Sequence, residues 1–345
     1  MQSNAIYGKE KKYDAVMIVS FGGPEGMDDV RPFLDNVLRG KNIPPARMEA
    51  VARHYEHFDG VSPLNAQNRE LKALLEAELK AHGIDLPVYW GNRNWKPYLR
   101  DTLQEMRGDG IHRCINYFTS AYSSYSGCRQ YRENIEQAVE ELGLEDMAFG
   151  KIRAFYNHPN WIEVNRQRVA EALAQIPGDR RAQTRIVYTA HSIPTAMSAS
   201  CHYVAQLEES ARLISEALQH VHHDLVYQSR SGPPDIPWLE PDVRDHLAAL
   251  KAQGIRDVVV HPLGFVSDHM EVLFDLDVEA REHCASIGLH MERSKAAGNH
   301  PRVISMIREL IEERLYDGVE PRSVGRQGPA HPVCPGDCCM PIRRP

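Results

Sequence analysis

The sequence lacks any long hydrophobic run. No stretch approaches the roughly 18 apolar residues that a membrane-spanning helix needs, so we expect no integral membrane segment. The polar residues before the apolar segment 14–20 also lack the hydrophobic core of a secretory signal. These two absences predict a cytoplasmic protein.

An excess of positive charge is missing as well. The chain of 345 residues carries 40 Lys and Arg against 47 Asp and Glu, a formal net charge of −7. A mildly acidic chain has no general attraction for polyanions, so we expect no nucleic-acid partner. The hydrophobic fraction of 42% is ordinary for a globular protein. The length fits two packed domains better than one compact core.

Cysteine is scarce along most of the chain and concentrated at its end. Of seven cysteines, three (Cys334, Cys338 and Cys339) lie in the last twelve residues. Cytosolic thiols stay reduced, so a disulfide framework is not expected. The segment 318–345 has no helical or strand periodicity and would be disordered by itself. Its thiols indicate that this segment is held to the rest of the protein. Sites with four thiolates suit zinc or an iron–sulfur cluster.

Short apolar segments rich in β-branched residues alternate with helical patterns. Strands are expected at 14–20, 86–91, 113–119, 150–156, 184–190, 224–228 and 256–261. Helices are expected at 70–82, 97–107, 131–142, 162–174, 204–220, 241–252, 270–286 and 301–316. Strands separated by such helices predict an α/β fold with parallel sheets flanked by helices. We place one α/β half at 13–158, a second at 159–300, a C-terminal helix at 301–316 and a tail at 317–345.

Unusual residues follow several of the expected strands. They occupy segments 21–24 (FGGP), 120–127, 191–194 (HSIP) and 264–271 (GFVSDHME). Ligands of α/β proteins bind beyond the carboxyl ends of the strands. We therefore expect these loops to meet at one site between the halves.

A row of carboxylates carries the strongest chemical signal. Glu271, Asp275 and Glu279 are spaced at i, i+4 and i+8, which places them on one face of a helix. A solvated acidic face is the usual explanation, but the surrounding residues are apolar, and no Lys or Arg lies between 264 and 279. Oxygen ligands that pass a hydrated dication inward explain the row better. Asp268, or else Ser267, is expected to cap this helix. His191 by itself is more often a packing or capping residue.

Six motifs together closely resemble the ferrochelatase family. In the family's order they are SFGGPEG at 20–26, GVSPLN at 60–65, AHSIP at 190–194, YQSRSGPP at 227–234, PWLEPDV at 237–243 and GFVSDHMEVLFDLD at 264–277. The similarity covers about residues 13–316. It implies the type II chelatase fold, in which two Rossmann-like halves hold a porphyrin between them and the C-terminal helix returns to the first half.

The resemblance also implies roles for the residues already identified. His191 matches the family's metal-site histidine, Glu271 its partner carboxylate, and Asp275 and Glu279 the acidic path behind it. Ferrous iron would be the substrate, and two protons would leave the porphyrin. The expected porphyrin contacts are Phe21, Arg39, Arg53, Ser62, Tyr125 and Trp238. Phe21 stands where some relatives have a tyrosine near the metal, and phenylalanine cannot bind iron.

The residues of these motifs are most similar to those of coproporphyrin ferrochelatases from actinobacteria. The segment 37–61 is polar, without the apolar lip of membrane-associated relatives, and its basic side chains suit propionates. We therefore expect coproporphyrin III as the porphyrin. Protoporphyrin IX, another metal such as cobalt, and a non-catalytic haem carrier are the alternatives. We also expect a monomer.

Some ferrochelatases carry a [2Fe–2S] cluster on one internal and three C-terminal cysteines. This resemblance implies a cluster on Cys128, Cys334, Cys338 and Cys339, with Cys201 as the alternative internal ligand. Zinc or a free tail remains the other possibility. Because the tail would lie away from the porphyrin, we expect a structural role for the cluster.

Overall fold

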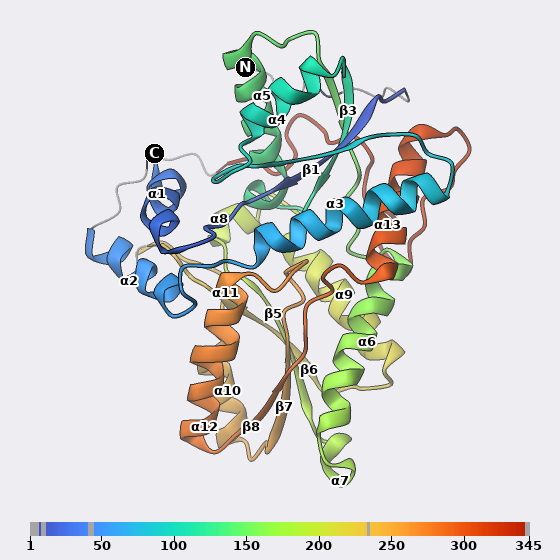
Figure 1. Cartoon of the computed structure of the whole chain (residues 1–345). Helices are drawn as coiled ribbons and strands as arrows, with labels where there is room; N and C mark the ends of the chain where they lie inside the picture. The colour runs from blue at the N-terminus through green and yellow to red at the C-terminus, as the bar shows by residue number, and fades with distance from the viewer. Residues whose placement is uncertain (1–6, 8–11, 41–44, 233–234, 342–345) are drawn as a thin grey trace.

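The computed structural model describes residues 7, 12–40, 45–232 and 235–341. Residues 233 and 234 of the expected strand-end motif 227–234 and residues 342–345 of the tail lie outside this description. Within it, the chain forms two four-stranded parallel sheets with helices on their faces (Figure 1). The predicted α/β class is confirmed.

Both sheets repeat one arrangement of strands. The first has the order β2-β1-β3-β4 and the second β6-β5-β7-β8. The strands are β1 (Ala15–Ser20), β2 (Val88–Asn92), β3 (Arg113–Phe118), β4 (Ala148–Lys151), β5 (Arg185–His191), β6 (His223–Gln228), β7 (Asp257–His261) and β8 (His290–Arg293). Every residue of β1 and β7 is buried. Covered faces explain why these strands are near-continuous apolar runs instead of alternating patterns.

Helices fill the connections between the strands (Figure 1). In the first half they are α1 (Met27–Leu38), α2 (Pro45–Glu56), α3 (Leu64–Ala81), α4 (Leu99–Gly108), the π-helix η1 (Tyr125–Arg129) and α5 (Gln130–Leu142). In the second they are α6 (Pro159–Gln175), α7 (Gly178–Arg181), α8 (Thr195–Ser198), α9 (Tyr203–Ala217), α10 (Val243–Ala252), α11 (Met270–Val272), the π-helix η2 (Leu273–Ala280) and α12 (Arg281–Ile287). The helix α13 (Pro301–Leu315) follows β8.

The two sheets share their largest hydrophobic core. Val16 of β1 and Tyr117 of β3 belong to the same buried cluster as Tyr188 of β5, Val259 of β7 and Ile307 of α13. The helix α13 packs against α3 and α6, so it contacts helices of both halves. Separate, smaller cores lie around the other helices of each half. The halves are thus joined through a common interior.

Several elements differ from the expectation. The helices α1 and α2 and the strand β8 were not predicted, and the fourth strand ends at Lys151 because residues 152–155 form a buried loop. The single helix expected at 270–286 is α11, η2 and α12 in succession, with a π-helical middle. Of its residues, Val272, Leu276 and Ala280 are buried, whereas the three acidic positions are half-buried.

No helix in the described part of the chain is long and apolar enough to cross a membrane.

Candidate functional site

His191 is the last residue of β5. The backbone N–H of Ser192 donates to the Gln228 carbonyl at 2.8 Å, which continues the β5–β6 pairing past the strand end. The His191 Nδ1 lies 2.5 Å from the Ser192 carbonyl oxygen, so Nδ1–H donates there. This contact orients the other ring nitrogen, Nε2, away from the strand.

Glu271, in the first turn of α11, faces that nitrogen. Its Oε1 lies 3.0 Å from His191 Nε2, and the two side chains are 37% and 34% exposed. Partial exposure leaves both groups accessible to a ligand. The resemblance implied that His191 and Glu271 are partners, and in the structure their side chains are in contact.

The pair is charged at neutral pH. Burial disfavours the imidazolium, but the charge and contact of Glu271, the Ser192 carbonyl and the charge of Asp275 together outweigh burial and raise the pKa of His191 to about 9. Burial likewise opposes the Glu271 carboxylate, but the charge and contact of His191, with smaller effects of His269 and Ser229, overcome burial and lower the pKa of Glu271 to about 2. The site therefore holds an imidazolium next to a carboxylate when no substrate is bound.

Asp275 lies behind this pair and has a different charge state. Its Oδ2 accepts hydrogen bonds from Ser229 Oγ and, at 3.3 Å, from Gln228 Nε2. Burial and the neighbouring Glu271 charge raise the pKa of Asp275 to about 7. Asp275 is thus poised to exchange a proton near neutral pH.

The outer end of the acidic row differs from the prediction. Glu279 has a basic neighbour after all, because Arg244 Nη1 of α10 lies 3.5 Å from its Oε2. Lys and Arg are absent only from the residues that lie close to the acidic row in the sequence, 264–279. Asp268 does not cap a helix, since its carboxylate pairs with Arg293 at 2.6 Å and accepts from the Ala296 N–H. The residue at the cap position of α11 is His269, which makes no side-chain cap hydrogen bond.

Helix α2 of the first half packs over the π-helix η2. The rings of His54 and Phe274 are stacked with centroids 3.8 Å apart. Burial and the charge of Glu271 raise the pKa of Tyr55. The first half therefore supplies side chains next to the Glu271 carboxylate.

The expected porphyrin contacts occupy several surfaces. Phe21 is 37% exposed, and the guanidinium of Arg93 lies 5.9 Å from its ring centroid. Trp238 pairs with Pro194 in a β-bridge beside the His191 loop. Ser62 is buried behind Gly23, where an added Cβ would lie 2.6 Å from the serine Cβ.

The remaining expected contacts are polar side chains. Tyr125 donates from its hydroxyl to Glu133 Oε2 at 2.9 Å. Arg39, at the end of α1, donates to Asn36 Oδ1 at 2.5 Å and is exposed, as is Arg53 on α2.

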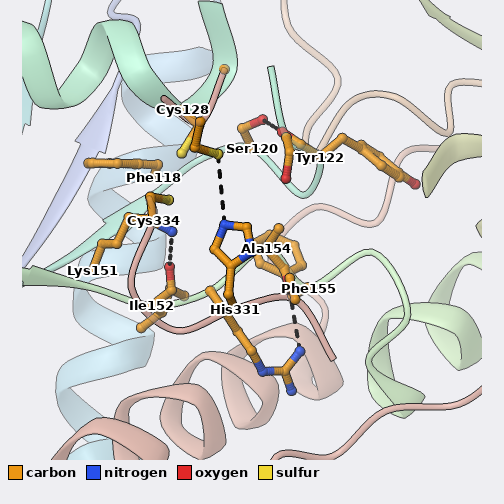
Figure 2. Close-up of a pocket in the computed structure, with 15 residues that line it drawn as sticks. Phe118, Ser120, Tyr122, Cys128, Lys151, Ile152, Ala154, Phe155, His331 and Cys334 are labelled. Atoms are coloured by element: carbon orange, nitrogen blue, oxygen red, sulfur yellow. Dashed lines mark hydrogen bonds between the residues drawn. The ribbon is translucent and has the colours of Figure 1, made fainter. Parts of the chain in front are cut away.

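The tail cysteines meet Cys128 in a second site away from His191. Figure 2 shows Cys128 of η1, Cys334 and His331 around one pocket. Cys334 Sγ makes hydrogen-bonding contacts with the sulfurs of Cys128 and Cys338. The sulfurs of Cys338 and Cys339 are 3.4 Å apart.

His331 adds a nitrogen donor to this cysteine pocket. Its Nε2 lies 3.7 Å from Cys338 Sγ, and its donor atom and those of Cys334 and Cys338 all lie within 4.8 Å of one another. Cys201 instead directs its sulfur to the Met197 and Ser198 carbonyls at 3.4 and 3.6 Å.

Two buried cations lie near Cys334: Lys151 lines the cysteine pocket, and Arg132 lines an adjoining cavity that Lys151 and Cys334 also line. Lys151 is 7% exposed and Arg132 is 2% exposed. The hydrogen bonds of Cys128 and Cys338, assisted by these two cations, lower the pKa of Cys334. Buried cations are costly unless anions face them. The pocket is therefore suited to a thiolate-bound, anionic group such as a metal centre.

Comparison with known proteins decides the family. The model of the ferrochelatase family matches residues 13–315. The chain belongs to the ferrochelatase family. A ferrochelatase of Rhodopirellula baltica is 55% identical over 95% of this chain and 93% of its own length. A coproporphyrin III ferrochelatase of Streptomyces coelicolor is 48% identical over 96% of this chain and 94% of its own.

Solved structures agree with this assignment at the level of the fold. SirB from Bacillus subtilis with Fe3+ has a TM-score of 0.53 at 13% identity, covering 87% of this chain and 96% of that chain. The sirohydrochlorin chelatase SirB from Bacillus subtilis subspecies spizizenii, in complex with cobalt, has a TM-score of 0.51. The predicted chelatase fold is confirmed.

Three residues near the ferrochelatase sites were not singled out from the sequence. His269 is half-buried, and partial burial lowers its pKa although Glu271 lies near. Its position two residues before Glu271 was an available signal. Arg93 reaches Phe21 from a strand-end loop, and His331 lies three residues before Cys334. No sequence pattern marks Arg93 or His331, because only the fold brings Arg93 close to Phe21 and His331 close to the cysteines.

Proposed function

We propose that this ferrochelatase family member inserts Fe²⁺ into coproporphyrin III and releases two protons. The observation that carries the proposal is the 3.0 Å approach of His191 Nε2 to Glu271 Oε1, with Asp275 behind it. A base that accepts the pyrrole protons and hard oxygen ligands that hold Fe²⁺ are what metal insertion into a porphyrin needs.

The charge states suggest how His191 becomes a base. At rest, Glu271 stabilises the imidazolium, which cannot accept a pyrrole proton. Fe²⁺ arriving at the Glu271 carboxylate neutralises that charge and repels the imidazolium, so His191 loses its proton. Neutral His191 can then accept a pyrrole N–H proton as iron enters the ring. Asp275, with its pKa near 7, is suited to carry protons outward.

The choice of porphyrin is supported by the relatives. Several proteins 45–49% identical to this chain are named coproporphyrin III ferrochelatases. Exposed Arg39 and Arg53 are the basic groups that we assign to propionates, with Ser62 and Tyr125 as hydrogen-bonding partners and Phe21 and Trp238 as apolar surfaces.

Anaerobic assays with Fe²⁺ and each porphyrin test this choice. We expect a higher kcat/KM for coproporphyrin III than for protoporphyrin IX. A clear preference for protoporphyrin IX would replace the substrate assignment, and tight porphyrin binding without any insertion would favour a carrier.

We also propose a [2Fe–2S] cluster in the cysteine pocket, held by Cys128, Cys334, Cys338 and Cys339. Support comes from the sulfur contacts and from buried Lys151. A cluster with four thiolates is anionic, which suits the buried Lys151 beside it. It would fix the tail to η1, and its chemistry is one-electron exchange at iron. Cys201 is a weaker ligand candidate because its sulfur contacts two carbonyls.

Metal and sulfide analysis of anaerobically purified protein distinguishes the pocket's contents. Two irons and two sulfides per chain are expected, with visible absorption that is lost in Cys128→Ser and kept in Cys201→Ser. A colourless protein with one zinc would assign the pocket to zinc, for which His331 and three cysteines are a suitable ligand set.

Three further assignments complete the proposal. We infer that the protein is cytoplasmic and monomeric. We also infer that segments 13–158 and 159–300 act as the two halves around the porphyrin, with 301–316 and 317–345 joining them. Sedimentation of the purified protein tests the monomer.

A further inference from the structure

Arg129 organises the end of the cysteine tail. Its side chain is 8% exposed, and Nη1 donates to the carbonyls of Gly336 and Cys338 at 2.9 and 3.1 Å and contacts Met340 Sδ at 3.1 Å. One buried guanidinium therefore contacts three points of a segment that has no regular secondary structure. The tail conformation and the Arg129 orientation depend on each other.

The same guanidinium holds a carboxylate that points the other way. Arg129 Nε donates to Glu133 Oε1 at 2.9 Å, and Glu133 Oε2 accepts from the Tyr125 hydroxyl at 2.9 Å. Tyr125 and Arg129 are the first and last residues of η1. The charge of Arg93, whose guanidinium also lies over Phe21, acts on the Tyr125 hydroxyl. A continuous set of polar contacts thus leads from the tail to the side of the molecule assigned to the porphyrin.

The tail also contacts the second half. The Met340 carbonyl accepts from Ser200 Oγ at 3.1 Å, just beyond α8, which follows the His191 loop. Arg326 N–H donates to Glu209 Oε1 of α9 at 2.8 Å. A docked tail therefore spans both halves, so its release changes contacts on each.

We propose that Arg129 is a positioning residue that couples docking of the tail to porphyrin binding through Glu133 and Tyr125. With the tail docked, Arg129 fixes Glu133, and Glu133 fixes the Tyr125 hydroxyl. When the tail leaves, the buried guanidinium loses its tail acceptors and keeps only Glu133 of the acceptors described, so it rearranges, which shifts Glu133 and disorders Tyr125. Coupling is reciprocal, so porphyrin binding must also stabilise the docked tail. The inference rests on the proposed role of Tyr125 as a porphyrin contact.

Two measurements on the full chain test the coupling. Coproporphyrin III affinity is measured by fluorescence quenching, and hydrogen–deuterium exchange of the tail is followed with and without the porphyrin. In the wild type, porphyrin should slow exchange across 334–341. Arg129→Gln should weaken porphyrin affinity by roughly 5-fold or more, abolish the porphyrin effect on the tail, and raise the porphyrin KM while kcat at saturation is retained.

Matched variants separate positioning from a general loss of structure. Gln137→Ala, on the exposed face of the adjacent α5, should behave as the wild type. Arg129→Lys keeps the charge beside Glu133 and should recover part of the affinity. Glu133→Gln tests the same link if Arg129→Gln fails to fold. In a double-mutant cycle, Arg129→Gln and Tyr125→Phe should be non-additive in porphyrin affinity.

Two results would overturn the coupling. One is wild-type porphyrin affinity in Arg129→Gln or Glu133→Gln, and the other is full additivity with Tyr125→Phe. Either would leave the proposed function intact as long as the wild type still inserts iron. A wild type that binds no porphyrin would contradict both proposals at once.

Discussion

The charge states of His191 and Glu271 depend on each other. Each is moved from its ordinary pKa in the direction that its burial opposes, so the pair itself sets the charge state. The imidazolium is a resting form that must lose its proton before it can act as a base. Any change at one member therefore alters the other.

Replacing Glu271 by Gln should lower the pKa of His191 from about 9 to below its ordinary value of 6.5, because the neighbouring charge disappears while burial remains. An NMR titration of the imidazole in substrate-free protein measures this shift. Glu279→Gln is the control and should leave the pKa close to 9, since Glu279 is not among the groups with the largest effects on His191. An unchanged pKa in Glu271→Gln would mean that the two side chains do not form the pair described.

The sequence predicted this residue-level chemistry in part. The spacing of Glu271, Asp275 and Glu279 was visible because it follows from helical periodicity alone. The basic partner of Glu279 was not, because Arg244 comes from α10 and meets it only after folding. Asp268 was wrongly assigned as a cap because a cap and an ion-pair partner share the same residue type.

At the scale of elements, strand ends and π-helices position the site. The loop after β7 passes very close to β5: a Cβ added at Gly264 would lie 2.6 Å from the Ala190 Cβ, next to His191. Only glycine permits this approach, because the nearest atoms belong to Ala190 and have no rotatable group that can move aside. The π-helix η2 continues from α11, which carries Glu271.

Gly264→Ala should therefore destabilise the fold by about 1–3 kcal/mol, as overpacking does, and reduce iron insertion by displacing α11 from β5. Urea unfolding and an insertion assay on the same preparation measure both effects. Gly108→Ala is the control, because no atom lies within 4 Å of the added Cβ at that position. Equal stability of the two variants would show that the loop and strand are not in close contact.

The strands could be predicted where both faces of the sheet are covered. The apolar runs of β1, β5 and β7 identified the strands within about one residue of their bounds. The helix α2 was missed because its mostly polar sequence lacks a strong apolar pattern. The helix α1 was missed although its buried Val30, Phe33 and Leu34 follow helical spacing. The π-helical turns follow from packing and have no periodicity of their own to detect.

At the scale of the whole molecule, the tail fixes segments that are far apart in the sequence. Arg153 lies at this junction: its Nε and Nη2 donate to the Glu313 carboxylate of α13 at 2.8 and 2.9 Å, and Nη2 also donates to the Arg322 carbonyl at 2.7 Å. The arginine side chain is 1% exposed and that of Glu313 is 8% exposed. The first part of the tail, at Arg322, therefore contacts a buried ion pair.

Arg153→Met should lower the free energy of unfolding by about 3–5 kcal/mol, because it leaves Glu313 buried without its cation. Equilibrium urea unfolding measures this loss. Arg31→Met removes one member of an exposed pair with Glu49 and should leave the free energy of unfolding almost unchanged. A similar small effect in both variants would contradict the structural importance of the Arg153–Glu313 pair.

The joining of the halves was beyond what the sequence could reveal. Length predicted two packed domains, whereas residues of both sheets share one buried core with α13. Periodicity identifies which face of a helix is apolar but not which partner covers it. The thiols of the tail could be identified from the sequence. Their neighbours Lys151, Arg132 and His331 could not, because only the fold brings these residues close to the thiols.

The most direct test of the central claim uses His191→Ala. Coproporphyrin III is bound to the variant, its binding is quantified, and Fe²⁺ is then added anaerobically while the visible spectrum is followed through a single turnover. We predict porphyrin affinity near that of the wild type and no metallation on the wild-type timescale. Metallation at the wild-type rate would contradict the assignment of His191, and with it the proposed insertion mechanism.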